Sequence, residues 1–242
     1  MLHLGKPFKE DNKGLFYIDS KDVEIKEFNF NEVTNNYRKH RVFYHIEGVD
    51  DYIIKDISMF PVYFNEYRNK KLLKNLQINQ DKFNDIDFPV AYFIDKKKVV
   101  GTVVPYYKGS ESLKVLSNNY KLEKLKEFYN HSDGEVSNLI EMCLEVLELI
   151  KHMYDENIIY TDINAGNFIV YNNTIKVVDF EPSYVHFKKN KKNYLSLLLS
   201  NYNLLVNYIW KHFGFRDMPY SPGENFREAK CMVKSLYKIK RG

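Results

Sequence analysis

The chain has 242 residues, of which 44% are hydrophobic and 28% are charged, and its formal net charge is +4. This composition is ordinary for a soluble globular protein rather than a disordered one, and the length predicts one large domain or two small lobes that share a cleft. The mild positive charge is better explained by a solvated basic surface, at the Lys-rich stretches 188–192 and 234–242, than by nucleic-acid binding.

The first residues and the cysteines favour a cytoplasmic protein. Residues 1–14 lack the long apolar region of a signal peptide. The most apolar later stretch, 194–210, is too short and too polar to span a bilayer, so we expect no transmembrane segment. Cys143 and Cys231 are far apart and lack metal-ligand spacing, which indicates neither a disulfide framework nor a zinc site.

The first part of the chain is predicted to be rich in β-strands. Residues 41–57 contain two β-rich runs around "EGVDD", which predicts a hairpin, and residues 88–107 predict a second hairpin with "DKKK" at its turn. Between them, residues 63–78 show the apolar spacing of a helix. We therefore expect an N-terminal lobe, residues 1–105, with an antiparallel sheet and one helix.

The second part is predicted to be mostly helical. Residues 134–157 form a long amphipathic pattern. Two short strands, "FIV" and "TIKVVDF", follow around the turn "YNN". From about residue 190 the pattern is helical again, with a Pro/Gly break at 219–224. The second lobe therefore comprises residues 106–242.

Three oxygen-bearing side chains stand at the edges of the predicted strands. Asn167 follows Asp162 by five residues, and Asp179 follows it by 17. Buried acids are costly unless they have partners, and a metal ion is one such partner. The pattern therefore raises the question of a cation site.

The order and spacing of these residues resemble the protein-kinase-like superfamily, which includes protein kinases and the aminoglycoside and choline phosphotransferases. "IIYTDINAGNFIV" resembles the catalytic loop, and "VVDFE" resembles the metal-binding segment. "YIIKDI" looks like the strand of the phosphate-binding lysine, here Lys55, and "FNEYRNKKLLKNL" is similar to the helix whose glutamate pairs with it, here Glu66. "VVGTVVPYYKGSESL" resembles the hinge, where the backbone around Pro105, Tyr106 and Tyr107 would hold adenine.

The resemblance covers roughly residues 40–185 and implies an α+β, two-lobed protein-kinase-like fold with a reduced C-lobe. It also implies ATP as a substrate and Mg²⁺ as a cofactor. Asp162 would accept the proton of the attacking hydroxyl or orient that hydroxyl, and Asn167 and Asp179 would coordinate Mg²⁺. The lysine, held by its glutamate, would neutralise the α- and β-phosphates.

The Gly-rich phosphate loop of the family is missing. No glycine lies between Gly14 and Gly48. Segment 29–40 would have to cover the phosphates instead, using Asn backbone groups or Arg38 and Lys39.

The catalytic loop and the segment after it also depart from the protein-kinase pattern. Tyr160 and Thr161 replace the usual His-Arg, and Asn164 stands where protein kinases commonly carry Lys. Glu181 replaces the glycine of the metal-binding motif, and only about ten residues separate "DFEP" from the next predicted helix. Most of an activation segment is therefore absent, and the "GN" ending of the loop is more typical of the small-molecule phosphotransferases.

These patterns favour an atypical Mg²⁺·ATP-dependent kinase that transfers the γ-phosphate to a hydroxyl acceptor, with a protein Ser/Thr as the preferred acceptor. One alternative is a small-molecule phosphotransferase of the aminoglycoside or choline type. Another is a pseudokinase that acts as a nucleotide- or protein-binding module. A basic nucleic-acid-binding protein is a weaker alternative, and binding that is insensitive to salt would contradict it.

Overall fold

The structure is a computed structural model of a mixed α+β protein. It describes residues 4–27, 42–56, 66–83, 85–118, 135–172, 174–187, 191–212 and 224–235. Segment 29–40, with the predicted phosphate contacts Arg38 and Lys39, lies outside these ranges, as does most of the Pro/Gly break at 219–224.

The chain folds into two compact units. Unit 1 comprises Met1–Lys108 and Glu181–Ser183, and unit 2 comprises Gly109–Phe180 and Tyr184–Gly242. The sequence predicted a boundary between residues 105 and 106, whereas the chain leaves unit 1 after residue 108. A short stretch beyond residue 180 also belongs to unit 1, which was not expected from the sequence.

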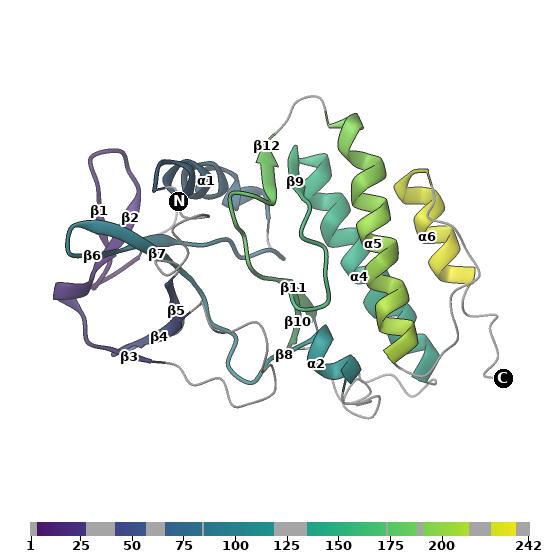
Figure 1. Ribbon diagram of the computed structural model, residues 1–242, viewed down its shortest axis with the longest axis horizontal. Coiled ribbons are helices and arrows are strands. Elements are labelled where there is room, and N and C mark those ends of the chain that lie inside the picture. Colours follow the sequence, from purple (N-terminus) through teal and green to yellow (C-terminus); the bar gives the residue numbers. More distant parts are fainter. Residues whose placement is uncertain are drawn as a thin grey trace. The chain divides into compact units, whose positions relative to one another are not determined.

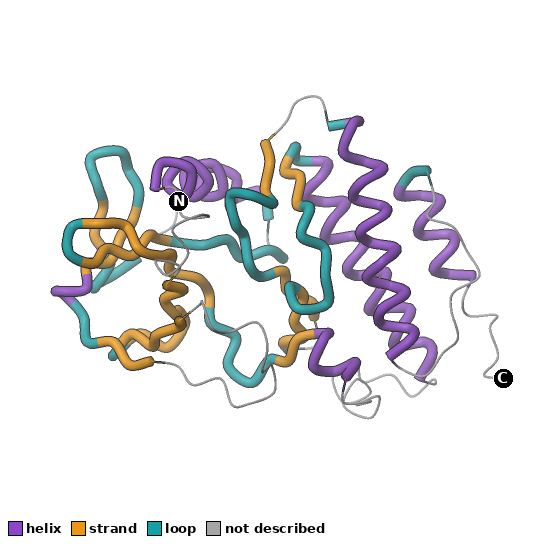
Figure 2. Tube along the Cα trace, viewed as in Figure 1, coloured by secondary structure: helices purple, strands orange, loops and turns teal. Residues whose placement is uncertain are grey.

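Unit 1 contains a seven-stranded sheet in the order β1-β2-β6-β7-β5-β4-β3. Strands are drawn in orange in Figure 2. The strands are β1 (Lys9–Glu10), β2 (Phe16–Asp19), β3 (Ile25–Glu27), β4 (Val42–Ile46), β5 (Val49–Asp56), β6 (Ala91–Asp95) and β7 (Lys98–Pro105). The two predicted hairpins are confirmed as the antiparallel pairs β4–β5 and β6–β7. The sheet is not entirely antiparallel as predicted, because β2 pairs in parallel with β6.

The β6–β7 hairpin follows from local backbone chemistry. Lys96 and Lys97 at its turn both have positive φ, as a two-residue hairpin turn of type I′ requires. Along β7, Val99 and Val103 are buried and alternate with less buried neighbours, which is the pattern of a strand with one face on a core. A Cβ added at Gly101 would collide with the carbonyl oxygen of Lys55, so glycine permits the close approach of β7 to β5.

The main core of unit 1 lies against this sheet. Its buried members are Ile18, Ile46, Ile54, Val90, Ala91, Phe93 and Val103. The predicted helix is α1 (Glu66–Asn79), which buries Leu72, Leu73 and Leu76 and is followed by the 3₁₀ turn η2 (Gln80–Lys82). Of the residues that give segment 63–78 its apolar spacing, Tyr67 is 72% exposed and Phe64 lies outside the described residues.

Unit 2 contains four described helices and two small sheets (Figure 1). The helices are α2 (Leu113–Asn118), α4 (Glu135–Asp155), α5 (Lys192–His212) and α6 (Phe226–Ser235). One sheet has the order β11-β10-β8, and the other pairs β12 with β9. These strands are β8 (Glu111–Ser112), β9 (Ile158–Tyr160), β10 (Phe168–Tyr171), β11 (Thr174–Val177) and β12 (Val185–Phe187).

Helix α4 is the central helix of unit 2, and it packs against α5, α6, β9 and β11. Where its side chains are described, from Ile140 on, the predicted apolar stripe is buried, and Cys143 is part of it. Burial raises the pKa of the Cys143 thiol to about 12, against a smaller lowering effect of its hydrogen bond with Trp210. Cys143 is therefore a core residue and not a nucleophile.

None of the helices in the described part of the chain combines the length and the apolar composition that a bilayer crossing needs.

Candidate active site

The loop that carries Asp162 and Asn167 connects two short buried strands of unit 2. Strand β9 ends at Tyr160, and β10 begins at Phe168, and both of these aromatic side chains are almost fully buried. The Tyr160 hydroxyl donates a hydrogen bond to the carbonyl oxygen of Val178, at 3.1 Å. Both ends of the loop are therefore fixed in the core of unit 2.

Side-chain amides hold the inside of this loop. Asn164 Nδ2 donates to Asp162 Oδ1 at 2.8 Å, while Asn164 Oδ1 accepts the backbone N–H of Gly166 at 2.9 Å. Asn167 Nδ2 donates to the carbonyl oxygen of Asp162 at 3.0 Å. Asn164 thus orients the carboxylate of Asp162. This role was not predicted, because the sequence marks Asn164 only as a departure from the protein-kinase pattern.

The segment with Asp179 is joined to the same loop. The N–H of Val178 donates to the carbonyl oxygen of Asn167 at 2.9 Å. Asp179 adopts φ +69°, in the left-handed region, which Asp adopts more readily than most other non-glycine residues. The structure therefore brings the three predicted oxygen-bearing residues together.

The residue before Asp162 is held from two other elements of unit 2. Asn201 on α5 donates through Nδ2 to the carbonyl oxygen of Thr161 at 2.8 Å. The backbone N–H and hydroxyl of Thr161 both donate to the carbonyl oxygen of Tyr184, at 2.8 and 3.0 Å. Asn201 was visible in the sequence only as a polar residue in an apolar stretch, which did not indicate its partner.

Lys55 and Glu181 form an ion pair within unit 1. Lys55 lies on β5 and is among the few buried charged residues of the described chain. Its Nζ lies 2.9 Å from Glu181 Oε1. The predicted partner Glu66 is the first residue of α1, and its side chain is not among those described. The Lys55–Glu66 pair stays a prediction.

The predicted adenine-binding stretch lies at and just after the end of β7. Pro105 is the last residue of this strand. The N–H of Tyr106 donates to the carbonyl oxygen of Asp51 at 2.8 Å, and the Tyr107 hydroxyl donates to Asp87 Oδ2 at 2.8 Å. The Tyr106 amide is therefore already used within unit 1, which limits the backbone donors that this stretch offers to adenine.

The oxygen atoms of Asp179 and Asn167 are ligands of the kind that a hard divalent cation prefers. Within the described ranges no three His, Cys, Asp or Glu side chains form a group that could hold a metal ion. Mg²⁺, however, is usually bound through one or two carboxylates together with waters and substrate phosphates. A carboxylate from Asp179 and the amide oxygen of Asn167 agree with such a site, in which the nucleotide supplies further ligands.

Comparison of the chain with models of known protein families gave no match, and comparison with curated proteins gave none either. The kinase-like interpretation therefore depends on the residues, their spacing and the local geometry described above.

Proposed function

We propose that the protein is an Mg²⁺·ATP-dependent phosphotransferase with a two-lobed protein-kinase-like fold, which transfers the γ-phosphate to a hydroxyl group, preferably of a protein Ser/Thr. The observation that carries this proposal is the hydrogen bond from Val178 N–H to the carbonyl oxygen of Asn167. It joins the backbone of the Asp162 loop to that of the Asp179 segment, so that the residues with oxygen-bearing side chains lie on two adjoining segments.

In the proposed reaction, Asp162 acts as the proton acceptor. The acceptor hydroxyl oxygen forms a bond to the γ-phosphorus, its proton passes to the Asp162 carboxylate, and the bond between the γ-phosphorus and ADP breaks. Because Asn164 donates to Oδ1 of Asp162, we assign the proton-accepting role to Oδ2. ADP and the phosphorylated acceptor are the products.

The remaining residues bind and neutralise the nucleotide. Asn167 and Asp179 would hold Mg²⁺, which supplies charge neutralisation on the phosphates when bound. Lys55 would contact the α- and β-phosphates, and Glu66 was predicted to position it. The backbone of residues 105–107 would contact adenine. Phosphoryl transfer depends mainly on such positioning and charge neutralisation.

A small-molecule acceptor is a second candidate, and the path of the chain after Asp179 favours it. After Glu181 the chain forms β12, which pairs with β9, and α5 begins at residue 192. This short connection has no room for the long segment on which protein kinases dock peptides. An aminoglycoside- or choline-like hydroxyl compound needs no such platform.

A pseudokinase is a third candidate, favoured by the predicted hinge. The Tyr106 amide is used by Asp51, which removes one backbone donor from adenine recognition. This function predicts nucleotide binding that is weak or independent of Mg²⁺, and no phosphate transfer at high protein concentration.

The experiment that tests the proposal measures transfer of labelled γ-phosphate from ATP, with Mg²⁺, to myelin basic protein, to choline and to kanamycin. We expect transfer to at least one of these acceptors or to the protein itself. Asp162→Asn keeps the size of the side chain and an oxygen for Asn164, but it cannot accept the proton. We therefore expect this variant to lose transfer by a factor of about 10² or more while it still binds ATP.

Asn172 provides a matched control, because it is an exposed residue of the β10–β11 turn outside the site. Asn172→Asp should transfer at the wild-type rate, since Asp also tolerates the positive φ found there. Wild-type transfer by Asp162→Asn contradicts the assigned mechanism, and transfer to a small acceptor alone selects the second candidate.

A further inference from the structure

Lys55 is a buried cation on firmly held backbone. It lies opposite Phe43 in β4 and Thr102 in β7, so strands flank it on both sides. Gly101 allows β7 to approach the Lys55 carbonyl group more closely than any side chain would permit. The Lys55 side chain is only 7% exposed. A buried ammonium group is costly unless a nearby acceptor compensates for the lost water.

Glu181 supplies a carboxylate to this ammonium group from a distant part of the sequence. Its Oε1 lies 2.9 Å from Lys55 Nζ, and its side chain is 19% exposed. A second observation agrees with this contact. Residues Glu181–Ser183 pack as part of unit 1, whereas the residues on both sides of them in the chain belong to unit 2. The backbone of Glu181 and its side chain therefore both belong with Lys55.

We propose that Glu181 is the positioning residue for Lys55, and that it ties the phosphate-binding lysine to the metal-binding segment; this inference rests on the proposed function. Glu181 follows Asp179 by only two residues. One short segment thus carries the carboxylate for the cation and the carboxylate for the lysine.

Substitutions of Glu181, Asp179 and Glu66 should affect ATP binding in different ways. Lys55 contacts the phosphates whether or not Mg²⁺ is present, so a residue that positions Lys55 affects ATP binding in both conditions. A residue that only binds the cation, as proposed for Asp179, affects only the Mg²⁺-dependent part. Glu181→Gln should therefore weaken ATP binding with Mg²⁺ and with EDTA, in contrast to Asp179→Asn. Glu66→Gln should have a smaller effect than Glu181→Gln.

The experiment is a calorimetric titration with ATP, with Mg²⁺ or with EDTA, on the wild type, Glu181→Gln, Lys55→Met and the double variant. We expect Glu181→Gln to raise Kd about 10- to 100-fold, as removal of a residue that orients a ligand-binding group does. The double variant should bind no more weakly than Lys55→Met alone, because Glu181 acts through Lys55. If Glu181→Gln only damaged the fold, it would weaken ATP binding further even when Lys55 is already replaced by Met. Glu10→Gln, on the exposed strand β1, serves as the control and should bind as the wild type does.

Other results of this titration would reject either the role of Glu181 alone or the phosphotransferase function as well. A wild-type Kd for Glu181→Gln, while Lys55→Met binds weakly, rejects the positioning role and leaves the phosphotransferase intact. Independent, multiplicative effects of the two substitutions also reject it. Absence of ATP binding by the wild type rejects the function and the inference together.

The stability of the variants toward urea tests the Lys55–Glu181 ion pair without any nucleotide. Glu181→Gln deprives the buried Lys55 ammonium group of the Glu181 carboxylate, whereas the double variant with Lys55→Met removes both charges of the pair. We therefore expect the double variant to be more resistant to urea than Glu181→Gln. Equal resistance of the two variants contradicts the pairing.

Discussion

Asp11 is a single carboxylate that organises the turn between β1 and β2. Its Oδ1 accepts the backbone N–H groups of Lys13 and Leu15 at 2.8 and 3.0 Å, and its Oδ2 accepts the Tyr92 hydroxyl at 3.0 Å. Burial raises the pKa of Asp11, but these hydrogen bonds, helped by the charge of Lys70, outweigh burial and leave the pKa below its ordinary value of 3.8.

The depressed pKa of Asp11 predicts a pH-dependent contribution to stability. The contribution is fully present above pH 3.8 and is lost as the pH falls through the folded-state pKa, because the unfolded state then binds the proton more strongly. Asp11→Asn cannot accept the Tyr92 hydroxyl as the carboxylate does, so we expect a loss of about 1 kcal/mol in unfolding free energy at neutral pH. The measurement is urea unfolding across this pH range, and the difference from the wild type should shrink below pH 3.8.

Asp50 serves as the control, because it is an exposed carboxylate on β5. Asp50→Asn should change stability little at any pH. A difference between Asp11→Asn and the wild type that stays constant as the pH falls would contradict the role of the ionised carboxylate.

Some residues of the candidate site could be recognised in the sequence, and others could not. The spacing of Asp162, Asn167 and Asp179 is visible in the sequence, because these residues lie just outside the ends of β9, β10 and β11, and hydrogen bonds join the segments that carry them. The contact between Lys55 and Glu181 joins positions 126 residues apart. No local pattern records such a contact, because it depends on how distant segments pack.

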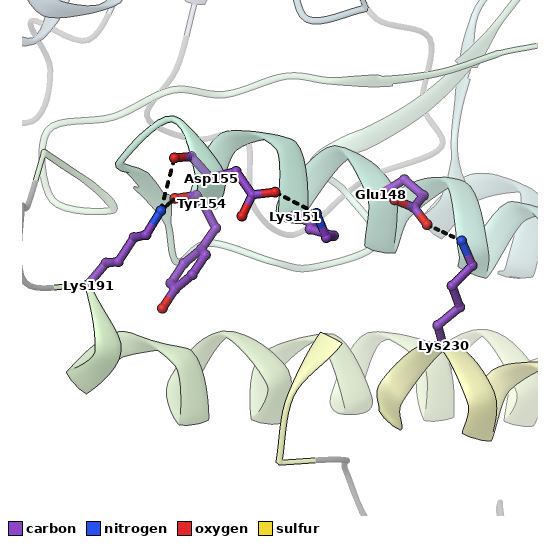
Figure 3. A network of polar contacts seen from close by, with 6 residues as sticks. All are labelled: Glu148, Lys151, Tyr154, Asp155, Lys191 and Lys230. Atoms are coloured by element: carbon purple, nitrogen blue, oxygen red, sulfur yellow. Dashed lines mark hydrogen bonds and ion pairs between the residues drawn. The ribbon is translucent and has the colours of Figure 1, made fainter. Parts of the chain in front are cut away.

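At the scale of elements, the C-terminal end of α4 is held by a network of polar contacts (Figure 3). The last carbonyl groups of a helix have no partner within the helix. Lys191, just before α5, donates to the carbonyl oxygens of Tyr154 and Asp155 at 2.7 and 2.9 Å, and its ammonium group lies 4.6 Å from the centre of the Tyr154 ring. A cation at this end also complements the helix dipole.

Loss of this cation should destabilise unit 2. Lys191→Met keeps the length of the aliphatic chain but removes the donor and the charge. We expect it to lower the unfolding free energy by about 1–2 kcal/mol, measured by urea denaturation. Lys192→Met is the matched control, because Lys192 is an exposed neighbour at the same end of α5. Equal stability of the two variants would show that Lys191 contributes nothing to the end of α4.

Periodicity predicted the long elements well and the short ones poorly. The helix expected at 134–157 is α4, and the two expected hairpins are present. Strands β1, β3, β9 and β12 were not predicted, because each has only two or three residues. Alternation of apolar and polar residues cannot be recognised over so few positions. Whether such short strands form depends on their pairing with another strand.

At the scale of the whole molecule, the division into units does not follow the order of the sequence. Glu181–Ser183 belongs to unit 1, although the chain on both sides of it belongs to unit 2. Lys55 lies in unit 1, whereas Asp162, Asn167 and Asp179 lie in unit 2. The α+β class was predicted from the order of hairpins and helices, but the assignment of this short segment required its tertiary packing.

The most direct test of the proposed phosphotransferase site needs no knowledge of the acceptor. It measures thermal unfolding of the wild type and of Asp179→Asn, with ATP alone, Mg²⁺ alone, and both. Asn tolerates the left-handed backbone found at residue 179, so the substitution changes the charge with little strain. A ligand at about 100 times its Kd stabilises the folded state by roughly 2.7 kcal/mol.

We expect a rise in Tm of the wild type that is largest with ATP and Mg²⁺ together, and loss of the Mg²⁺-dependent part in Asp179→Asn. A wild type that is not stabilised by the pair of ligands, or is stabilised equally without Mg²⁺ and without the Asp179 carboxylate, would contradict a magnesium–nucleotide site in this protein.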